Sequence, residues 1–369
     1  MLLVTGSTGH LGANLVRRLL DDGHFVRVLL RPNCDQSALA GLNVEPVYGD
    51  LRDPASCKAA VQGCNGIHHC AALVSTVEGN RRHKRDIYET NVLGTRILLR
   101  AALDAGVQKV VVTGSLSAVG HDPHRPVNEE DPFDPFAWNL PYGMSKAFVE
   151  HECLRAFADG LPVVLAVSCA IIGPNDFKPS RLGQTLVDFA NRKLWAYIPG
   201  GFAFVSARDM VEGHVLAMDK GRPGQKYIFS SQFLTVDELL TIFEKVTGQR
   251  RPKLRLPGGL MAGLARLSDL VLRFLPHSRR RFTPGAIRFL RMRRRVDCSK
   301  AREELGYRPT SIGQAVREAY DFFVQRGLIS GRPSPRQTAE SPGFPESANR
   351  HVSPTDADSP LTTHHSPTP

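Results

Sequence analysis

Closely spaced cysteine pairs are missing from this chain of 369 residues. An odd number of scattered cysteines without a CxxC pair argues against both a disulfide framework and a structural zinc site. We therefore expect reduced thiols, no bound metal and a cytoplasmic location. The seven cysteines are Cys34, Cys57, Cys64, Cys70, Cys153, Cys169 and Cys298.

Long hydrophobic runs are also missing. The most apolar late stretch, residues 256–275, is interrupted by Arg266, Asp269 and Arg273, so no window resembles a membrane span. The opening MLLVTGSTGHLG has no basic segment, and we expect neither a signal peptide nor a membrane anchor there. With 42% apolar and 22% charged residues, the chain is long enough for a large globular core.

Acidic residues are scarce in one segment. The net charge is +11, but residues 250–295 hold 14 Lys or Arg and a single acid, Asp269. We interpret this segment as a solvated Arg-rich lobe, with docking to an anionic membrane surface or another anionic partner as the alternative. An apolar stripe over residues 260–274 predicts a helix packed on the lobe, or else one lying on a membrane. Nucleic acid is not expected, because no aromatic residues interleave with the basic ones.

Short β-branched runs alternate with amphipathic stretches over the first 115 residues. Predicted helices include one ending near Gly23, one beginning at Asp53 and Pro54, and a long crossover over residues 82–105. This alternation predicts an α/β fold with a doubly wound parallel sheet of the Rossmann type. The expected strands cover residues 2–5, 25–30, 44–48, 66–69 and 109–113.

The pattern loosens after residue 161. One more strand is predicted over residues 162–167, and helices over 208–218 and 236–246. The last 39 residues hold eight prolines and few large apolar side chains, which predicts disorder. We expect three parts: a Rossmann domain over residues 1–170, a substrate lobe interwoven with the sheet edge over 171–330, and a disordered Pro/Ser/Thr-rich tail over 331–369.

Glycines recur at a three-residue spacing in the turn after the first strand. Gly6, Gly9 and Gly12 leave the backbone open to close approach. The following helix N-terminus supplies unpaired N–H groups and a partial positive charge. This turn predicts a binding site for the pyrophosphate of a dinucleotide.

The end of the second strand is expected to select that dinucleotide. An acid there holds the ribose 2′-hydroxyl of NAD, whereas an arginine accommodates the 2′-phosphate of NADP. Leu30 stands at the acid position and Arg31 follows it. This favours NADP, with NAD as the alternative. The simplest alternative for Arg31 is a solvent-exposed strand end without a role in binding. Asp50, just past the third strand, is placed to contact the edge of the adenine ring. The alternative is that Asp50 only caps a turn.

Tyr142 and Lys146 stand one helical turn apart in the stretch PYGMSKA. A tyrosine with an ordinary pKa near ~10 is a poor proton shuttle at neutral pH unless positive charge stabilises its anion. Lys146 and the helix N-terminus are expected to supply that charge. Ser115 ends the fifth strand, at the edge where such sheets bind ligands, and we expect it to hold a substrate oxygen while Tyr142 exchanges the proton.

These motifs together resemble the extended short-chain dehydrogenases/reductases of the epimerase/dehydratase type. The resemblance rests on TGxxGxxG, the serine after the fifth strand, YxxxK, NVLGT at 91–95 and CAA at 70–72. GPNDFKPS at 173–180, RDM at 208–210 and CSKA at 298–301 are similar to the dihydroflavonol-4-reductase-like and hopanoid-associated sugar epimerase-like branch. The resemblance covers about residues 1 to 328.

The resemblance implies a catalytic triad of Ser115, Tyr142 and Lys146, of which the last two also contact the cofactor. Two departures stand nearby: Gly114 replaces a frequent serine, and residues 167–169 lack the proline usual near the nicotinamide carboxamide. The implied cofactor-binding residues are otherwise Gly6, Gly9, His10, Leu11, Gly12, Asp50, Leu51, Ala71, Ala72 and, in a supporting position, Asn91.

The leading functional hypothesis is an NADP-dependent oxidoreductase acting on a small molecule with a carbonyl group or a secondary alcohol. The alternatives are a nucleotide-sugar epimerase or dehydratase that recycles NAD, and a nucleotide-binding protein without turnover. Relatives of this type suggest a homodimer paired through the crossover helix and the Tyr142 helix. Aromatic residues of the loops 121–140 and 177–195 either wall the substrate pocket or close the core of the lobe.

Overall fold

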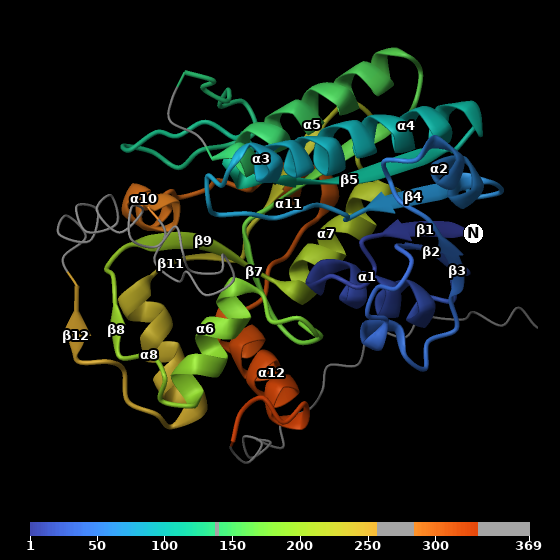
Figure 1. Ribbon diagram of the computed structural model, residues 1–369. Helices are drawn as coiled ribbons and strands as arrows, with labels where there is room; N and C mark the ends of the chain where they lie inside the picture. Colours follow the sequence, from blue (N-terminus) through green and yellow to red (C-terminus); the bar gives the residue numbers. More distant parts are fainter. Residues whose placement is uncertain (137–139, 257–283, 331–369) are drawn as a thin grey trace, which may run out of the picture. The chain divides into compact units, whose positions relative to one another are not determined.

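The computed structural model describes residues 1–136, 140–256 and 284–330, all within one compact unit (Figure 1). The tail over 331–369 and the helix expected over residues 260–274 lie outside these ranges. All seven cysteines lie inside them and are free thiols. None of the helices described is long and apolar enough to cross a membrane.

Within the described residues, seven strands form one parallel sheet in the order β10-β6-β5-β4-β1-β2-β3. The order reverses at β1, so β1 and β4 flank the switch point where such sheets bind ligands. All six strands predicted up to residue 167 are confirmed to within one or two residues at each end. The strands are β1 Leu2–Thr5, β2 Val26–Leu30, β3 Glu45–Tyr48, β4 Gly66–His69, β5 Lys109–Ser115, β6 Val163–Ser168 and β10 Lys226–Phe229.

Helices cover both faces of this sheet, as predicted (Figure 1). On one face Leu15 and Leu19 of α1 pack with Met210 of α7, and on the other Leu98 of α4 packs with Val149 of α5. Burial of these apolar stripes is what holds the layers together. The helices are α1 His10–Asp21, α2 Pro54–Val61, α3 Arg81–Tyr88, α4 Gly94–Asp104, α5 Pro141–Ala158 and α7 Ala207–Asp219; the short η1 and η3 cover Ser37–Leu39 and Leu116–Ala118.

Local signals in the sequence set several of these boundaries. Asp53 caps α2 by accepting hydrogen bonds from the N–H groups of Ala55 and Ser56. Gly23, just beyond α1, has a φ of +80°, which glycine adopts without strain. The predicted crossover helix is continuous from α3 to α4 but contains a π-helical turn, η2 Glu89–Leu93. Such turns often occur at functional sites.

The later part of the chain builds a second core beside the sheet. Phe204, Phe243 and Phe323 are fully buried there between a three-stranded sheet and three helices. Because β10 and α7 return to the main sheet, this part is interwoven with it, and the expected domain boundary at residue 170 stays a prediction. The elements are β7 Ala170–Ile172, β9 Gly201–Ser206, β11 Gln232–Thr235, α6 Arg181–Ala190, α8 Val236–Thr247, α12 Ile312–Gln325, the pair β8 Ala196–Tyr197 and β12 Leu254–Arg255, α10 Pro284–Met292 and α11 Ser299–Leu305.

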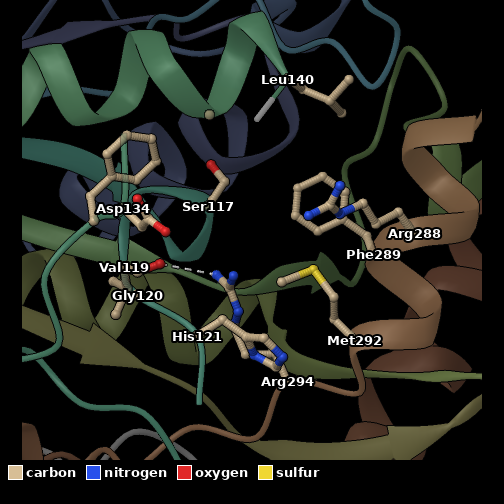
Figure 2. A pocket seen from close by; sticks show the side chains of 12 residues that line it. Ser117, Val119, Gly120, His121, Asp134, Leu140, Arg288, Phe289, Met292 and Arg294 are labelled. Atoms are coloured by element: carbon tan, nitrogen blue, oxygen red, sulfur yellow. Dashed lines mark hydrogen bonds between the residues drawn. The ribbon is translucent and has the colours of Figure 1, made fainter. Parts of the chain in front are cut away.

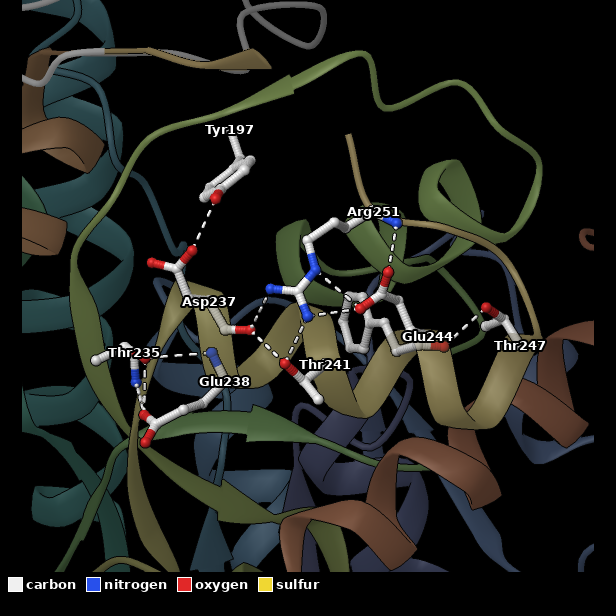
Figure 3. A network of polar contacts seen from close by, with 9 residues as sticks. Tyr197, Thr235, Asp237, Glu238, Thr241, Glu244, Thr247 and Arg251 are labelled. Carbon is white, nitrogen blue, oxygen red and sulfur yellow. Dashed lines mark hydrogen bonds and ion pairs between the residues drawn. The ribbon is translucent and has the colours of Figure 1, made fainter. Parts of the chain in front are cut away.

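The start of the basic segment is tied to acids of α8 (Figure 3). Arg251 donates two hydrogen bonds to the Glu244 carboxylate, and Arg255 forms an ion pair with Asp237 at 3.3 Å. Part of the positive charge of residues 250–295 is therefore neutralised inside the lobe. Docking of this segment to an anionic surface stays a prediction, because residues 257–283 lie outside the described ranges.

Candidate active site

The glycine turn after β1 leaves no room for side chains. Gly6 has a φ of +73°, and a Cβ on it would lie 2.6 Å from the backbone nitrogen of Ala71. A Cβ on Gly12 would lie 2.2 Å from the carbonyl oxygen of Gly6. Gly9 caps α1 without a side chain, and the buried Ser7 hydroxyl has no hydrogen-bond partner among the described residues. An open helix N-terminus and an unpaired hydroxyl at the switch point fit a bound pyrophosphate.

Two other residues of this turn face the protein. The His10 Nε2 lies 3.1 Å from the carbonyl oxygen of Pro174, and the Leu11 side chain is buried in the core. Burial lowers the pKa of His10, although Asp176 opposes the change. Both residues therefore offer only backbone groups to a nucleotide. Through His10 the turn is also joined to the loop that leads into the lobe.

The two residues at the end of β2 differ in exposure, and the choice of NADP stays a prediction. Leu30 is buried, whereas Arg31 is exposed. The Asp50 carboxylate is already held by Arg52, at 2.8 Å, and hydrogen bonds from Arg52 lower its pKa. The sequence analysis did not find this partner. Leu51 is buried against Gly94 of α4, and Ala71 and Ala72 follow β4 at the same edge of the sheet.

Ser115 and Tyr142 meet at the carboxyl edge of the sheet. Ser115 ends β5 and caps η3, while Tyr142 follows Pro141 in the first turn of α5. The Tyr142 side chain lies near that of Ser115, and the Ser115 Oγ lies 2.8 Å from the Ser117 Oγ. The structure thus joins a serine and a tyrosine that stand 27 positions apart in the chain.

Burial controls the ionisation of Tyr142 and Lys146. It raises the pKa of Tyr142 to about 12, with the hydrogen bond to Ser115 acting in the opposite direction. It lowers the pKa of Lys146 to about 8. The Lys146 Nζ donates to the carbonyl oxygen of Thr113 at 2.7 Å. The expected lowering of the Tyr142 pKa is therefore wrong for the protein alone: burial of the phenol raises this pKa, and Lys146 is not among the causes of the shift.

Asn91 lies behind Tyr142, in the π-helical turn. Its Nδ2 donates to the Ser145 Oγ at 2.9 Å, and this hydroxyl donates to the Tyr142 carbonyl oxygen at 2.7 Å. Its Oδ1 accepts from the Leu73 N–H at 2.7 Å. Asn91 thus fixes the backbone of Tyr142 relative to the segment after β4. Ser145, inside the YxxxK motif, is a positioning residue that the sequence analysis missed.

A cavity of about 230 Å³ is lined by residues that include Ser117, Leu140 and Arg294 (Figure 2). Ser117 and Gly143 connect it to Ser115 and Tyr142. That α10 and the residues after it line this cavity was not predicted. In an Arg-rich run, the sequence does not indicate which arginine side chains point into the cavity. The lining residues are Ser117, Val119, Gly120, His121, Phe133, Asp134, Leu140, Gly143, Arg288, Phe289, Met292 and Arg294.

The aromatic residues expected either to wall the pocket or to close the core divide into three groups. Phe133 lines the cavity, as expected. Phe136 is 97% exposed and Trp195 is 66% exposed, so neither forms a wall in the described structure. Phe177 packs against Phe322 with ring centroids 5.1 Å apart and so closes the lobe. The remaining tryptophan, Trp138, lies outside the described residues.

Comparisons with known proteins agree with this geometry. A family model described as the NAD dependent epimerase/dehydratase family matches residues 2–229. The chain is 44% identical over 328 residues to sterol demethylase protein B of Methylococcus capsulatus, covering 89% of this chain and 99% of that relative. It is 31% identical over 367 residues to a 3 beta-hydroxysteroid dehydrogenase/Delta 5-->4-isomerase of Mycobacterium tuberculosis, covering 88% and 90%.

A solved structure shares the architecture. The crystal structure of DesIV, a dTDP-glucose 4,6-dehydratase from Streptomyces venezuelae with NAD and TYD bound, aligns with a TM-score of 0.72 and 25% identity, covering 89% of this chain and 98% of that one. The relatives thus include enzymes named for sterols and steroids as well as for a nucleotide sugar.

The titration of Lys146 makes a stability prediction. The unfolded chain holds this proton up to its ordinary pKa of about 10.4, whereas the folded chain releases it near the lowered pKa of about 8. Between these values the unfolded state binds more protons, so the free energy of unfolding rises with pH. Relative to Lys146→Met, the wild-type chain should gain about 2 kcal/mol between about pH 7 and about pH 10, as measured by urea unfolding.

Comparison with Lys146→Met cancels the titration of every other group. The exposed Lys58→Met is the matched control and should show no such difference, because its ammonium stays in water in both states. A gap between wild type and Lys146→Met that is constant with pH would contradict the lowered pKa.

Proposed function

Because the chain belongs to the NAD dependent epimerase/dehydratase family, we propose that it is an NADP-dependent oxidoreductase that interconverts a secondary alcohol and a ketone. The single observation that carries this proposal is that Tyr142 lies near Ser115 at the carboxyl edge of the sheet, beside a cavity lined by Ser117 and Gly143. Enzymes of the family act on a CH–OH or carbonyl group with NAD or NADP. The choice of NADP and of net oxidation or reduction is our proposal.

The proposed roles follow from the positions of the side chains. The nicotinamide cofactor supplies or accepts a hydride when bound. Ser115 holds the substrate oxygen, and Tyr142, whose pKa near 12 keeps its proton at neutral pH, donates that proton to a ketone oxygen as the oxygen becomes an alcohol. Lys146, protonated below about pH 8, stabilises the phenolate left behind. In alcohol oxidation the same groups move the proton in the opposite direction.

The proposed cofactor site extends from the glycine turn to this pair. Backbone groups of residues 6–12 hold the pyrophosphate, residues 50–51 contact the adenine, and residues 71–72 lie along the cofactor. Arg31 meets the 2′-phosphate. Lys146 and Tyr142 contact the nicotinamide ribose, and Asn91 supports them from behind.

The cavity walls favour an apolar ring substrate. Phe133, Leu140 and Met292 present apolar surface next to Ser117. This lining, together with relatives named for sterols and steroids, supports a cyclic ketone or alcohol more than a nucleotide sugar.

The decisive test follows NADPH absorbance with a panel of cyclic ketones that includes a 3-ketosteroid. The wild-type chain should oxidise NADPH, and Tyr142→Phe should lower kcat by ~100-fold or more, since the proton donor is lost. The Kd of NADPH, from fluorescence, should change less than about twofold. Tyr88→Phe, an exposed tyrosine on α3, is the matched control. Interconversion of a sugar nucleotide without net use of NADPH would instead assign an epimerase, and full activity in Tyr142→Phe would refute the proposed role.

Arg31 tests the choice of cofactor. Arg31→Ala should weaken NADPH binding by ~10-fold or more and leave NADH binding nearly unchanged, since only the 2′-phosphate contact is lost. Equilibrium fluorescence titration with each nucleotide measures this. Arg82→Ala on α3 removes an equal charge from an exposed position away from β2 and controls for net charge. Equal weakening of both nucleotides would contradict the assignment.

We also propose a homodimer formed through α3 and α5. Tyr88 and Phe148 are each 41% exposed and pack edge to face, with ring centroids 6.2 Å apart. Exposed aromatic pairs of this kind mark interfaces. Light scattering after size exclusion should give twice the mass of one chain, and Phe148→Asp should give the mass of a single chain. Phe25→Asp, at an exposed site just before β2, should not change the mass. A monomeric wild-type chain would refute the dimer.

A further inference from the structure

Arg294 lines the cavity, and the hydrogen-bonding capacity of its guanidinium is only partly satisfied. Its Nη1 donates to the carbonyl oxygens of Leu116 and Val119, at 2.6 and 3.2 Å. Its Nε is buried and has no hydrogen-bond partner among the described residues. Figure 2 shows the guanidinium reaching into the cavity between Val119 and Met292.

No carboxylate within the described ranges forms an ion pair with Arg294. Burial lowers the pKa of Arg294 to about 10, which still leaves it charged at neutral pH. The cavity holds a second cation, Arg288, and one acid, Asp134, whose Oδ1 accepts from the Phe136 N–H at 2.9 Å. Burial and the nearby Arg294 lower the pKa of His121, so this ring is neutral at pH 7. The lining is therefore net positive.

A buried guanidinium with an unsatisfied donor is costly for the protein alone. Carbonyl oxygens satisfy part of its hydrogen-bonding capacity but do not compensate its charge. The planar fork of an arginine matches the two oxygens of a carboxylate, and this pairing is strongest where water is excluded. A ligand carboxylate in the cavity would supply the opposite charge that Arg294 lacks.

We propose that Arg294 binds a carboxylate carried by the substrate. The proposal rests on the proposed function and deepens it, because the substrate becomes a cyclic ketone or alcohol that also bears an acid group. The chain of contacts supports this placement: Arg294 lines the same cavity as Ser117, and the Ser117 hydroxyl contacts Ser115. The carboxylate would then orient the substrate oxygen toward Ser115 and Tyr142. Arg294 then determines substrate specificity, and Tyr142 carries out the proposed proton transfer.

The first test measures binding without turnover. Calorimetry in the presence of NADP⁺ compares cyclohexanecarboxylate with its primary amide, which has nearly the same shape and no charge. The wild-type chain should bind the acid at least ~10-fold more tightly than the amide. Arg294→Gln should abolish this preference, and Arg294→Lys should keep part of it. The neighbouring Arg295→Gln, at an exposed position, is the matched control and should keep all of it.

Equal affinity of the wild-type chain for acid and amide would overturn the proposal, whether or not the variants fold. Preferential binding of cyclohexyl phosphate over the acid would also overturn it, since the site would then be built for phosphate.

The second test separates this inference from the proposed function. Turnover of 3-oxocyclohexanecarboxylate with NADPH is compared with that of its amide, and the acid should show at least ~10-fold higher kcat/KM through a lower KM. Selective binding of the acid without turnover of either compound would refute the proposed reductase and retain the carboxylate site. Equal turnover of both compounds would retain the reductase and refute the site.

Discussion

Ser115 at the carboxyl end of β5 lies near Tyr142 in the first turn of α5, and the site is arranged around these two side chains. Each neighbouring contact restricts one of these two segments. Lys146 ties α5 to the Thr113 carbonyl oxygen, and Asn91 holds the Tyr142 backbone through Ser145. Together these contacts fix Tyr142 relative to the edge of a parallel sheet, and the proposed proton transfer requires such preorganisation.

The exclusion of water sets the chemistry of this region. Lys146 and Arg294 are cations moved out of water, and Tyr142 is a phenol whose anion is disfavoured there. None of the three is fully compensated by the described protein groups. A bound molecule would therefore change the electrostatic environment of all three groups. A nucleotide and a substrate oxygen would contact the lysine and the tyrosine, and an anionic substituent would contact the arginine.

Distant parts of the chain build this region together. The first 115 residues supply the glycine turn and Ser115, whereas the cavity is completed by Arg288 and Arg294, which lie late in the predicted lobe segment over 171–330. The isolated bridge between Val127 and Val296 places the Arg294 segment beside the loop after β5. Phe133 of that loop lines the cavity, while Phe177 packs inside the lobe, so aromatic content alone did not distinguish a wall from a core.

The sequence by itself determined six of the seven strands of the main sheet, the helices that cover it, and Ser115, Tyr142 and Lys146 as candidate catalytic residues. Strand periodicity, the capping pair Asp53 and Pro54, and YxxxK are short-range patterns whose meaning does not depend on distant residues. Only the tertiary structure decided the ionisation of Tyr142, the engagement of Asp50 by Arg52 and the inward turn of Arg294. Desolvation and ion pairing depend on which groups lie close together in space. A contact between residues far apart in the chain produces no local sequence pattern from which it could be predicted.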